Sequence, residues 1–236
     1  AVAVDTGGGV DRLLAGDNNI QLIKRPKQLL GPKAYWHLDC LKRFFGNSLE
    51  GKRILDIGCG TGYVSALAAS QGANVIATEM HDKNIERAKL VFKAFEVDKL
   101  AKVLKIDMQK MSPQELGSFD AALFLGTIYH CEYPLDVLKA VGEMTKAIVL
   151  DARLAMPEQV NDEKWGLEFL REVYSDQNNF SPIRRVGGGV IRKPTRQSMI
   201  KMLRMSGFNE VYQVMPYEKM QKHFLDEEFI QFVAFK

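Results

Sequence analysis

Four residues with chemically useful side chains follow four successive apolar segments of this sequence. Asp56, Glu79, Asp107 and His130 stand at or just after stretches rich in Ile, Leu, Val and Ala. Carboxylates accept hydrogen bonds and attract cations, and a histidine titrates near neutral pH. If the apolar segments are parallel strands, their carboxyl ends meet at one edge of a sheet, where ligands bind in open α/β folds. The spacing predicts a ligand site that combines acidic side chains with a candidate base.

A glycine-rich turn, Gly58-Cys59-Gly60-Thr61-Gly62, lies between the first apolar segment and a predicted helix. Glycine allows the backbone to approach a ligand closely, and the start of a helix adds unpaired N–H groups. The spacing is GxGxG, and Tyr63 occupies the position of the third glycine in a pyrophosphate-binding GxGxxG turn. Asp56 would repel a pyrophosphate, whereas it suits the sulfonium and amino groups of S-adenosyl-L-methionine. We interpret Cys59 as a packing residue rather than a nucleophile.

Further residues are predicted to bind the rest of this cofactor. Glu79, with Met80 beside it, is placed to accept hydrogen bonds from the ribose hydroxyls, and Gly126 follows the fourth strand. Asp107 would accept from the adenine amino group while Met108 packs on the ring. The plainer alternatives are a surface Glu and a turn Asp. The second is the more credible of the two, because Asp is common in turns.

The run Gly126-Thr127-Ile128-Tyr129-His130 would bring polar groups to the methyl group of the cofactor. Methyl transfer is an in-line displacement, so the protein must align the two reactants and remove a proton where the acceptor carries one. His130 is the candidate base, or it only orients its loop. Tyr129 would line the methyl pocket and contact substrate, or it belongs to the core.

The elements that position these residues alternate between strand and helix. Strands are predicted at 53–57, 74–78, 101–106, 119–125 and 147–150, and helices lie between them. A helix from Pro32 would place Tyr35 and Leu38 inward, and Asp82 would cap a helix that runs to about Phe95. Alternation of this kind predicts a parallel sheet with helices on both faces. Segments 208–215 and 229–235 are predicted to pair as antiparallel strands at one sheet edge.

Residues 152–194 are too many for a simple connection, and long insertions are usually lids or binding loops. Seven basic residues and no acidic ones lie between positions 177 and 209. This charge favours an anionic partner, although a solvated surface is the commoner outcome. Substrate contacts are therefore predicted for Trp165, Tyr174, Arg184, Arg185 and Arg192.

Taken together, Asp56, the GxGxG turn, Glu79 and Asp107 resemble class I S-adenosylmethionine-dependent methyltransferases over about residues 50–236. The resemblance implies an α/β fold: a Rossmann-like, doubly wound seven-stranded sheet, mostly parallel with an antiparallel last strand. The run from Gly126 to Leu138 also resembles the tRNA wobble-uridine carboxymethyltransferase family, which uses carboxy-S-adenosylmethionine. That family tends to be basic after the histidine. Because Cys131 and Glu132 stand there, plain S-adenosyl-L-methionine is the expected cofactor.

Composition limits the class of protein. The 236 residues are 46% hydrophobic and 26% charged, which is typical of a globular chain. We expect a flexible segment and cap helix at 1–48, followed by a methyltransferase domain at 49–236. No apolar run reaches the roughly 18 residues that span a bilayer, and no signal peptide is evident. Three scattered cysteines have no zinc spacing. A cytoplasmic enzyme without a metal ion or membrane contact is expected.

Three classes of function remain from the sequence. The leading one is a methyltransferase acting on a small, anionic metabolite, with an RNA-modifying methyltransferase as the alternative. A second class is an inactive S-adenosylmethionine-binding regulatory protein. A third, a nicotinamide dehydrogenase, is disfavoured by the glycine spacing and Asp56. The acceptor atom and the oligomeric state are not determined by the sequence.

Overall fold

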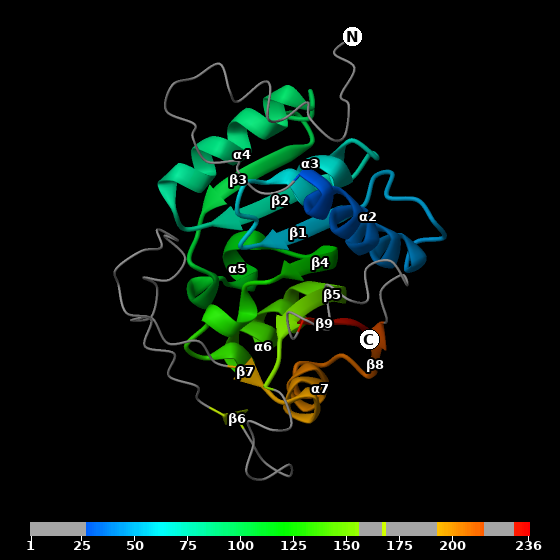
Figure 1. Cartoon of the computed structure of the whole chain (residues 1–236), viewed down its shortest axis with the longest axis vertical. Helices are drawn as coiled ribbons and strands as arrows, with labels where there is room; N and C mark the ends of the chain where they lie inside the picture. The colour runs from blue at the N-terminus through cyan, green and yellow to red at the C-terminus, as the bar shows by residue number, and fades with distance from the viewer. Residues whose placement is uncertain (1–26, 156–166, 169–192, 215–228) are drawn as a thin grey trace. The chain divides into compact units, whose positions relative to one another are not determined.

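The computed structural model describes residues 27–155, 167–168, 193–214 and 229–236 (Figure 1). Internal contacts divide the chain after Lys105 into two compact units, which are described in turn. The first contains α2 (Lys27–Arg43), β1 (Arg53–Ile57), α3 (Tyr63–Ala69), β2 (Asn74–Glu79), α4 (Asp82–Ala94) and β3 (Ala101–Lys105). The second contains η1 (Met108–Lys110), α5 (Pro113–Leu116), β4 (Phe119–Leu125), η2 (Ile128–His130), α6 (Pro134–Met144), β5 (Thr145–Arg153), β6 (Leu167–Glu168), β7 (Lys193–Pro194), α7 (Arg196–Met205), β8 (Glu210–Val214) and β9 (Phe229–Phe235).

Seven of these strands form one mixed sheet in the order β3-β2-β1-β4-β5-β9-β8, and β6 pairs with β7 separately. The predicted α/β fold with a mostly parallel, seven-stranded sheet is therefore confirmed. In the first unit, β1, β2 and β3 lie side by side and parallel (Figure 1). Four of the five residues of β1 are buried, as expected for a parallel strand covered on both faces. This arrangement sets Asp56 and Glu79 near the carboxyl ends of neighbouring strands.

Helix α2 begins several residues before the predicted Pro32 and ends at Arg43. Trp36, Leu38 and Leu41 are buried on its inward face. The prediction that Tyr35 points inward is wrong, because 38% of its surface is exposed. Trp36, one position on, takes the buried place instead, and adjacent positions on a helix point about 100° apart.

Helix α4 packs on β3 and on α3 through Ile85, Ala88 and Phe92, which recur at helical spacing. The prediction that Asp82 caps this helix is wrong. His81 holds the cap position, whereas Asp82 is the first helical residue and forms an exposed ion pair with Lys105. An Asp in the first turn still interacts favourably with the helix dipole.

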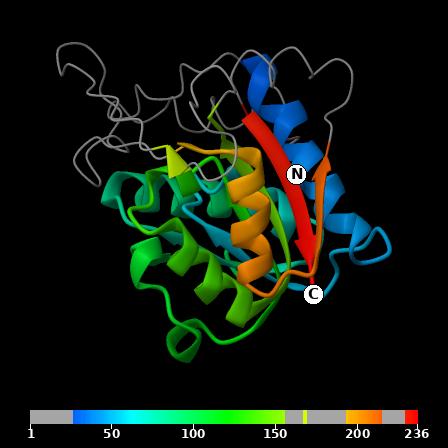
Figure 2. The same cartoon turned by 90° about the horizontal axis from the view of Figure 1, so that it is seen from below.

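In the second unit, β4 and β5 are parallel, and β9 runs antiparallel to β5. Strand β8 pairs with the other side of β9, and Figure 2 shows β9 in red beside β8 in orange. The predicted antiparallel pair at one sheet edge is thus confirmed, and the structure adds that the last strand of the chain lies between β5 and β8. Strand β5 covers 145–153, longer than the predicted 147–150.

Helices α6 and α7 pack against each other in this unit. Pro134 occupies the first turn of α6, as predicted. The side chain of Thr195 caps α7 by accepting a hydrogen bond from the N–H of Ser198 at 3.1 Å, which confirms the predicted cap. Met199 and Leu203 are buried, also as predicted.

Several expectations fall outside the described residues. The predicted flexible segment at 1–20 and most of the predicted insertion at 152–194 belong to this group, so the proposed domain boundaries stay predictions. Within the described ranges, no helix combines the length and apolar character that a membrane span needs.

Gly142 of α6 lies directly against Ser206, the residue that caps the end of α7, and a Cβ on Gly142 would overlap the main-chain carbonyl of Ser206. We expect Gly142→Ala to lower the free energy of unfolding by about 2 kcal/mol, because the helices must separate. Helix propensity alone would favour alanine by about 1 kcal/mol. Urea denaturation measures the difference. Lys139→Ala, exposed on the same helix, is the control and should stay within about 0.5 kcal/mol of the parent. An unchanged Gly142→Ala midpoint would contradict the close packing.

Candidate active site

The glycine turn between β1 and α3 depends on backbone angles that favour glycine. Gly58, Gly60 and Gly62 have φ angles of 65°, 59° and 73°, all in the left-handed region. The N–H of Cys59 donates to the carbonyl of Thr78 at 3.0 Å, and the N–H of Gly58 lies 3.4 Å from the Thr78 hydroxyl. Two successive residues of the turn are thereby attached to the end of β2.

Gly62 also explains how α3 and α4 come together. A Cβ at this position would lie 2.8 Å from the side chains of both Ala88 and Phe92. The last glycine of the motif therefore sets the contact between the two helices, in addition to shaping the turn. Tyr63, which replaces the third glycine of a pyrophosphate-binding turn, packs edge-on against Phe95 at 5.8 Å between ring centroids.

The carboxylate of Glu79 is almost fully buried, with 6% of the residue exposed, and accepts hydrogen bonds from three backbone groups. Oε1 accepts from the N–H of Met80 at 2.8 Å and of His81 at 2.9 Å. Oε2 accepts from the N–H of Gly60 at 3.0 Å. Glu79 therefore anchors the middle of the glycine turn through its side chain.

Asp56 is also buried, with 2% of its surface exposed, and its Oδ2 accepts a hydrogen bond from the hydroxyl of Ser65 in α3. Burial raises the pKa of Asp56 to about 6; the Ser65 bond acts against this, and the Glu79 carboxylate adds to it. Two buried carboxylates thus share the space beneath one turn. A bound cation would relieve their repulsion.

Cys59 lies in the turn between these carboxylates. Burial raises the pKa of its thiol well above the usual value, and the charges of Asp56 and Glu79 raise it further. A thiol that stays protonated is a poor nucleophile. This agrees with its interpretation as a packing residue.

In the second unit, Asp107 caps η1 by accepting a hydrogen bond from the N–H of Gln109 at 3.0 Å. This is the role in a turn that the sequence analysis gave as the alternative for Asp107. The hydrogen bond uses Oδ1, so Oδ2 can still accept from other partners. The loop after β3 also contacts the loop after β4. The thiol of Cys131 lies 3.1 Å from the Met108 sulfur, and the N–H of Glu132 donates to the Gln109 side chain at 2.9 Å.

The loop after β4 contains Tyr129 and His130, which both belong to η2. Their rings are 4.5 Å apart between centroids and inclined by 49°. A Cβ on Gly126 would lie 3.8 Å from the Tyr129 hydroxyl, so this side chain folds back toward the end of β4. Tyr129 and His130 are partly exposed, whereas Ile128 and Cys131 anchor the loop in the core. The structure therefore brings Gly126, Tyr129 and His130 together.

Other predicted contacts fall outside the described residues: Trp165, Tyr174, Arg184, Arg185 and Arg192. In the described part of the chain, no three His, Cys, Asp or Glu side chains gather closely enough to hold a metal ion.

Sequence reasoning missed three polar residues that build the site: Ser65, Thr78 and Asn84. The Ser65 hydroxyl donates to Asp56, and the Thr78 hydroxyl accepts from the N–H of Gly58. The Asn84 amide lies beside the Glu79 carboxylate. Ser65 and Asn84 sit within helices, where polar residues on a buried face are the only signal. That signal becomes visible only when the buried face is known.

Comparison with known proteins agrees with this arrangement. Residues 55–148 match the family described as "Methyltransferase domain". The ubiquinone biosynthesis O-methyltransferase of Dechloromonas aromatica is 35% identical over 99 residues, 42% of each chain. The tRNA U34 carboxymethyltransferase of Haemophilus influenzae is 32% identical over 115 residues, 48% of this chain and 34% of that protein. Residues 55–148 are therefore similar to methyltransferase domains.

The matches to these curated relatives span less than half of their length, so they concern the matched part of each chain and not the whole protein. The fold extends further. The N-terminal domain of EvdMO1, determined in the presence of SAH and D-fucose, superposes with a TM-score of 0.67 at 19% identity. That match covers 96% of this chain and 93% of the other. It confirms the α/β fold of this chain.

Asp56→Asn is expected to stabilise the ligand-free protein above pH 6. The native pKa of about 6 lies above the ordinary value of 3.8, so the native state holds this proton more tightly. The free energy of unfolding of the parent therefore falls as pH rises from about 4 to about 6. A shift of about two units corresponds to about 3 kcal/mol. Denaturation at pH 4 and pH 7.5 should show an advantage of the neutral Asn only at pH 7.5.

Asp98→Asn provides the matched control, because Asp98 is exposed. Its stability should follow the parent at both pH values. An Asp56→Asn advantage of equal size at pH 4 and pH 7.5 would contradict the raised pKa.

Proposed function

We propose that this chain is an S-adenosyl-L-methionine-dependent methyltransferase. The observation that carries the proposal is the pair of buried carboxylates, Asp56 and Glu79, at a glycine turn that has Tyr63 where a pyrophosphate-binding turn has its third glycine. A dinucleotide would bring two more negative charges to this position. A ligand with a sulfonium and an ammonium group supplies the missing positive charge.

Each group of the first unit has a stated task in this proposal. Glu79 accepts hydrogen bonds from the ribose hydroxyls through Oε2, which lies beside the turn. Asp56 supplies negative charge beneath the positive end of the cofactor, and the backbone of Gly58 to Gly62 surrounds it. When bound, S-adenosyl-L-methionine supplies an electrophilic methyl group on its sulfonium. The protein positions it and excludes water.

The other residues singled out by the sequence have proposed tasks of their own. Asp107, with one carboxylate oxygen held by Gln109, would orient the adenine amino group, and Met108 would pack on the ring. His130 would hold or accept the proton of the acceptor at one ring nitrogen. Tyr129 beside it would line the methyl-transfer site. These tasks follow from the sequence and are proposals for this chain.

A small, anionic metabolite is the proposed acceptor, and its binding is assigned to the arginines of the 152–194 segment. RNA is the second candidate, and one further observation favours it. Arg196, Lys201 and Arg204 are exposed along α7, a helix without acidic residues. Similarity to a protein named for tRNA modification points the same way. An inactive cofactor-binding protein would retain the first unit's site and lack transfer.

S-adenosylhomocysteine should raise the melting temperature of the protein, whereas NAD should not, because a ligand that binds only the native state stabilises it. Glu79→Gln should weaken S-adenosylhomocysteine binding about tenfold or more, since charge-assisted hydrogen bonds are lost. Differential scanning fluorimetry and calorimetry measure both effects. Glu86→Gln, an exposed residue of α4, is the control and should bind like the parent. Stabilisation by NAD alone would refute the proposal.

His130→Ala should leave S-adenosylhomocysteine affinity near that of the parent and slow methyl transfer about a hundredfold, because general base catalysis typically contributes that much. Transfer of radiolabelled methyl groups to total tRNA and, separately, to a small-molecule cell extract measures the rate and the acceptor class. Tyr133→Phe, an exposed neighbour, should transfer at the parental rate. An unchanged rate in His130→Ala would remove this residue from the catalytic group. Cofactor binding without transfer to either pool by the parent would favour the regulatory protein.

A further inference from the structure

Glu79 has a fourth neighbour besides its three backbone donors. The side-chain amide nitrogen of Asn84, in the first turns of α4, lies 3.4 Å from Glu79 Oε2. This is at the long end for a hydrogen bond, and the nearer donor to the same oxygen is the N–H of Gly60 at 3.0 Å. The two oxygens of Glu79 are therefore not equivalent. Oε1 is held by two short backbone bonds, whereas Oε2 is held by the turn and by Asn84.

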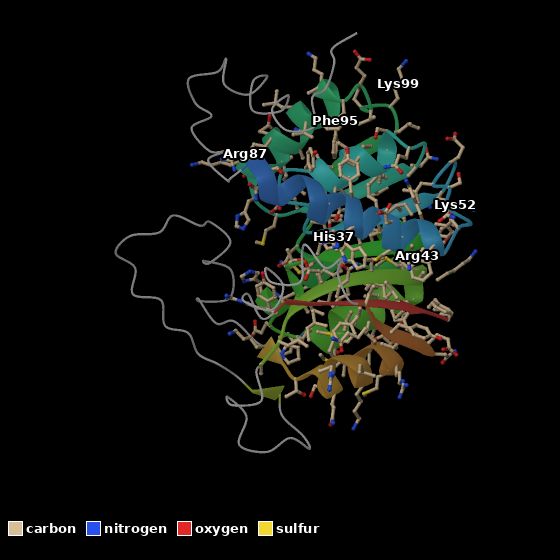
Figure 3. All side chains as sticks on the ribbon, turned by 45° about the vertical axis from the view of Figure 1, so that its right-hand side comes forward. His37, Arg43, Lys52, Arg87, Phe95 and Lys99 are labelled. Carbon is tan, nitrogen blue, oxygen red and sulfur yellow. The ribbon has the colours of Figure 1, made fainter. Side chains whose placement is uncertain are left out.

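The direction of the Asn84 amide is determined by a third residue. Arg87, labelled in Figure 3, donates through Nη1 to Asn84 Oδ1 at 3.2 Å. A guanidinium only donates and a carboxylate only accepts. Asn84 can satisfy both only with its oxygen toward Arg87 and its nitrogen toward Glu79. The order Arg87, Asn84, Glu79 is thus a directed hydrogen-bond chain.

The burial of Asn84 makes this series of hydrogen bonds unfavourable in free energy unless it contributes to function. Asn84 is 6% exposed and lies on the buried face of α4 with Ile85 and Ala88, whereas Lys83 and Glu86 are exposed. A buried amide is unfavourable without hydrogen bonds, and Asn is a poorer helix former than an apolar Leu or Met. Packing alone would place an apolar side chain here.

We propose that Asn84 is a positioning residue, which directs Glu79 Oε2 toward the ribose hydroxyls of the cofactor, and that Arg87 fixes the direction of the Asn84 amide. This inference rests on the proposed function. The N–H of Gly60 belongs to the turn that surrounds the ligand, so its bond to Oε2 is exposed to any adjustment of that turn. Asn84 approaches from α4, outside the turn, and holds the oxygen independently of it.

The proposal is tested by comparing two ligands on one set of variants. Asn84→Ala should weaken S-adenosylhomocysteine binding about tenfold, the size expected for lost bonding to a charged group. It should leave the affinity for the 2′,3′-dideoxyadenosyl analogue unchanged within about twofold, because that analogue has no hydroxyls for Glu79 to bind. Arg87→Met should weaken S-adenosylhomocysteine binding by a smaller factor, about threefold, and should likewise leave the affinity for the analogue unchanged. Competition calorimetry measures all of these affinities.

Lys89→Met and Glu86→Ala, which remove exposed charges on the same helix, are the controls and should bind both ligands like the parent. Melting temperatures without ligand establish that each variant is folded. Equal weakening of both ligands in Asn84→Ala would reveal a general structural role and overturn the inference. Failure of the parent itself to bind S-adenosylhomocysteine would instead refute the proposed function.

Discussion

The attachment of the glycine turn to the end of β2 is the constraint on which the candidate site depends. Glu79 holds the N–H of Gly60, and Thr78 holds those of Gly58 and Cys59. A turn of alternating glycines has high conformational entropy when free, so fixing it needs several hydrogen bonds. These hydrogen-bond partners belong to β2, the strand adjacent to β1. Pairing of β1 with β2 therefore also brings together the groups that fix the glycine turn.

The same arrangement concentrates negative charge. Glu79 lies close enough to Asp56 for its charge to raise the pKa of Asp56, and both residues are buried. Buried like charges lower the stability of the empty protein. Sites that bind charged ligands commonly carry such a cost, because complementarity to the ligand conflicts with stability in its absence. The proposed cationic ligand would compensate this cost.

The local elements were largely predictable. Strands β1, β4 and β9 match the predicted 53–57, 119–125 and 229–235, because short, mostly apolar segments allow few alternatives. The errors occurred where helical periodicity was ambiguous. Tyr35 and Trp36 are adjacent, and only packing decides which is buried. At α4, both His81 and Asp82 could begin the helix, and the ion pair between Asp82 and Lys105 joins residues distant in sequence.

The sequence by itself determined the order of the main strands and helices, the glycine turn and the acidic residues at or just after the ends of the first three strands. These are set by residue type and spacing, which act over a few positions. Only the tertiary structure decided that Glu79 binds Gly60, that Ser65 bonds Asp56 and that the Asn84 amide lies between Arg87 and Glu79. Such contacts depend on the direction of each side chain within a packed core, and that direction is fixed by neighbours from other elements.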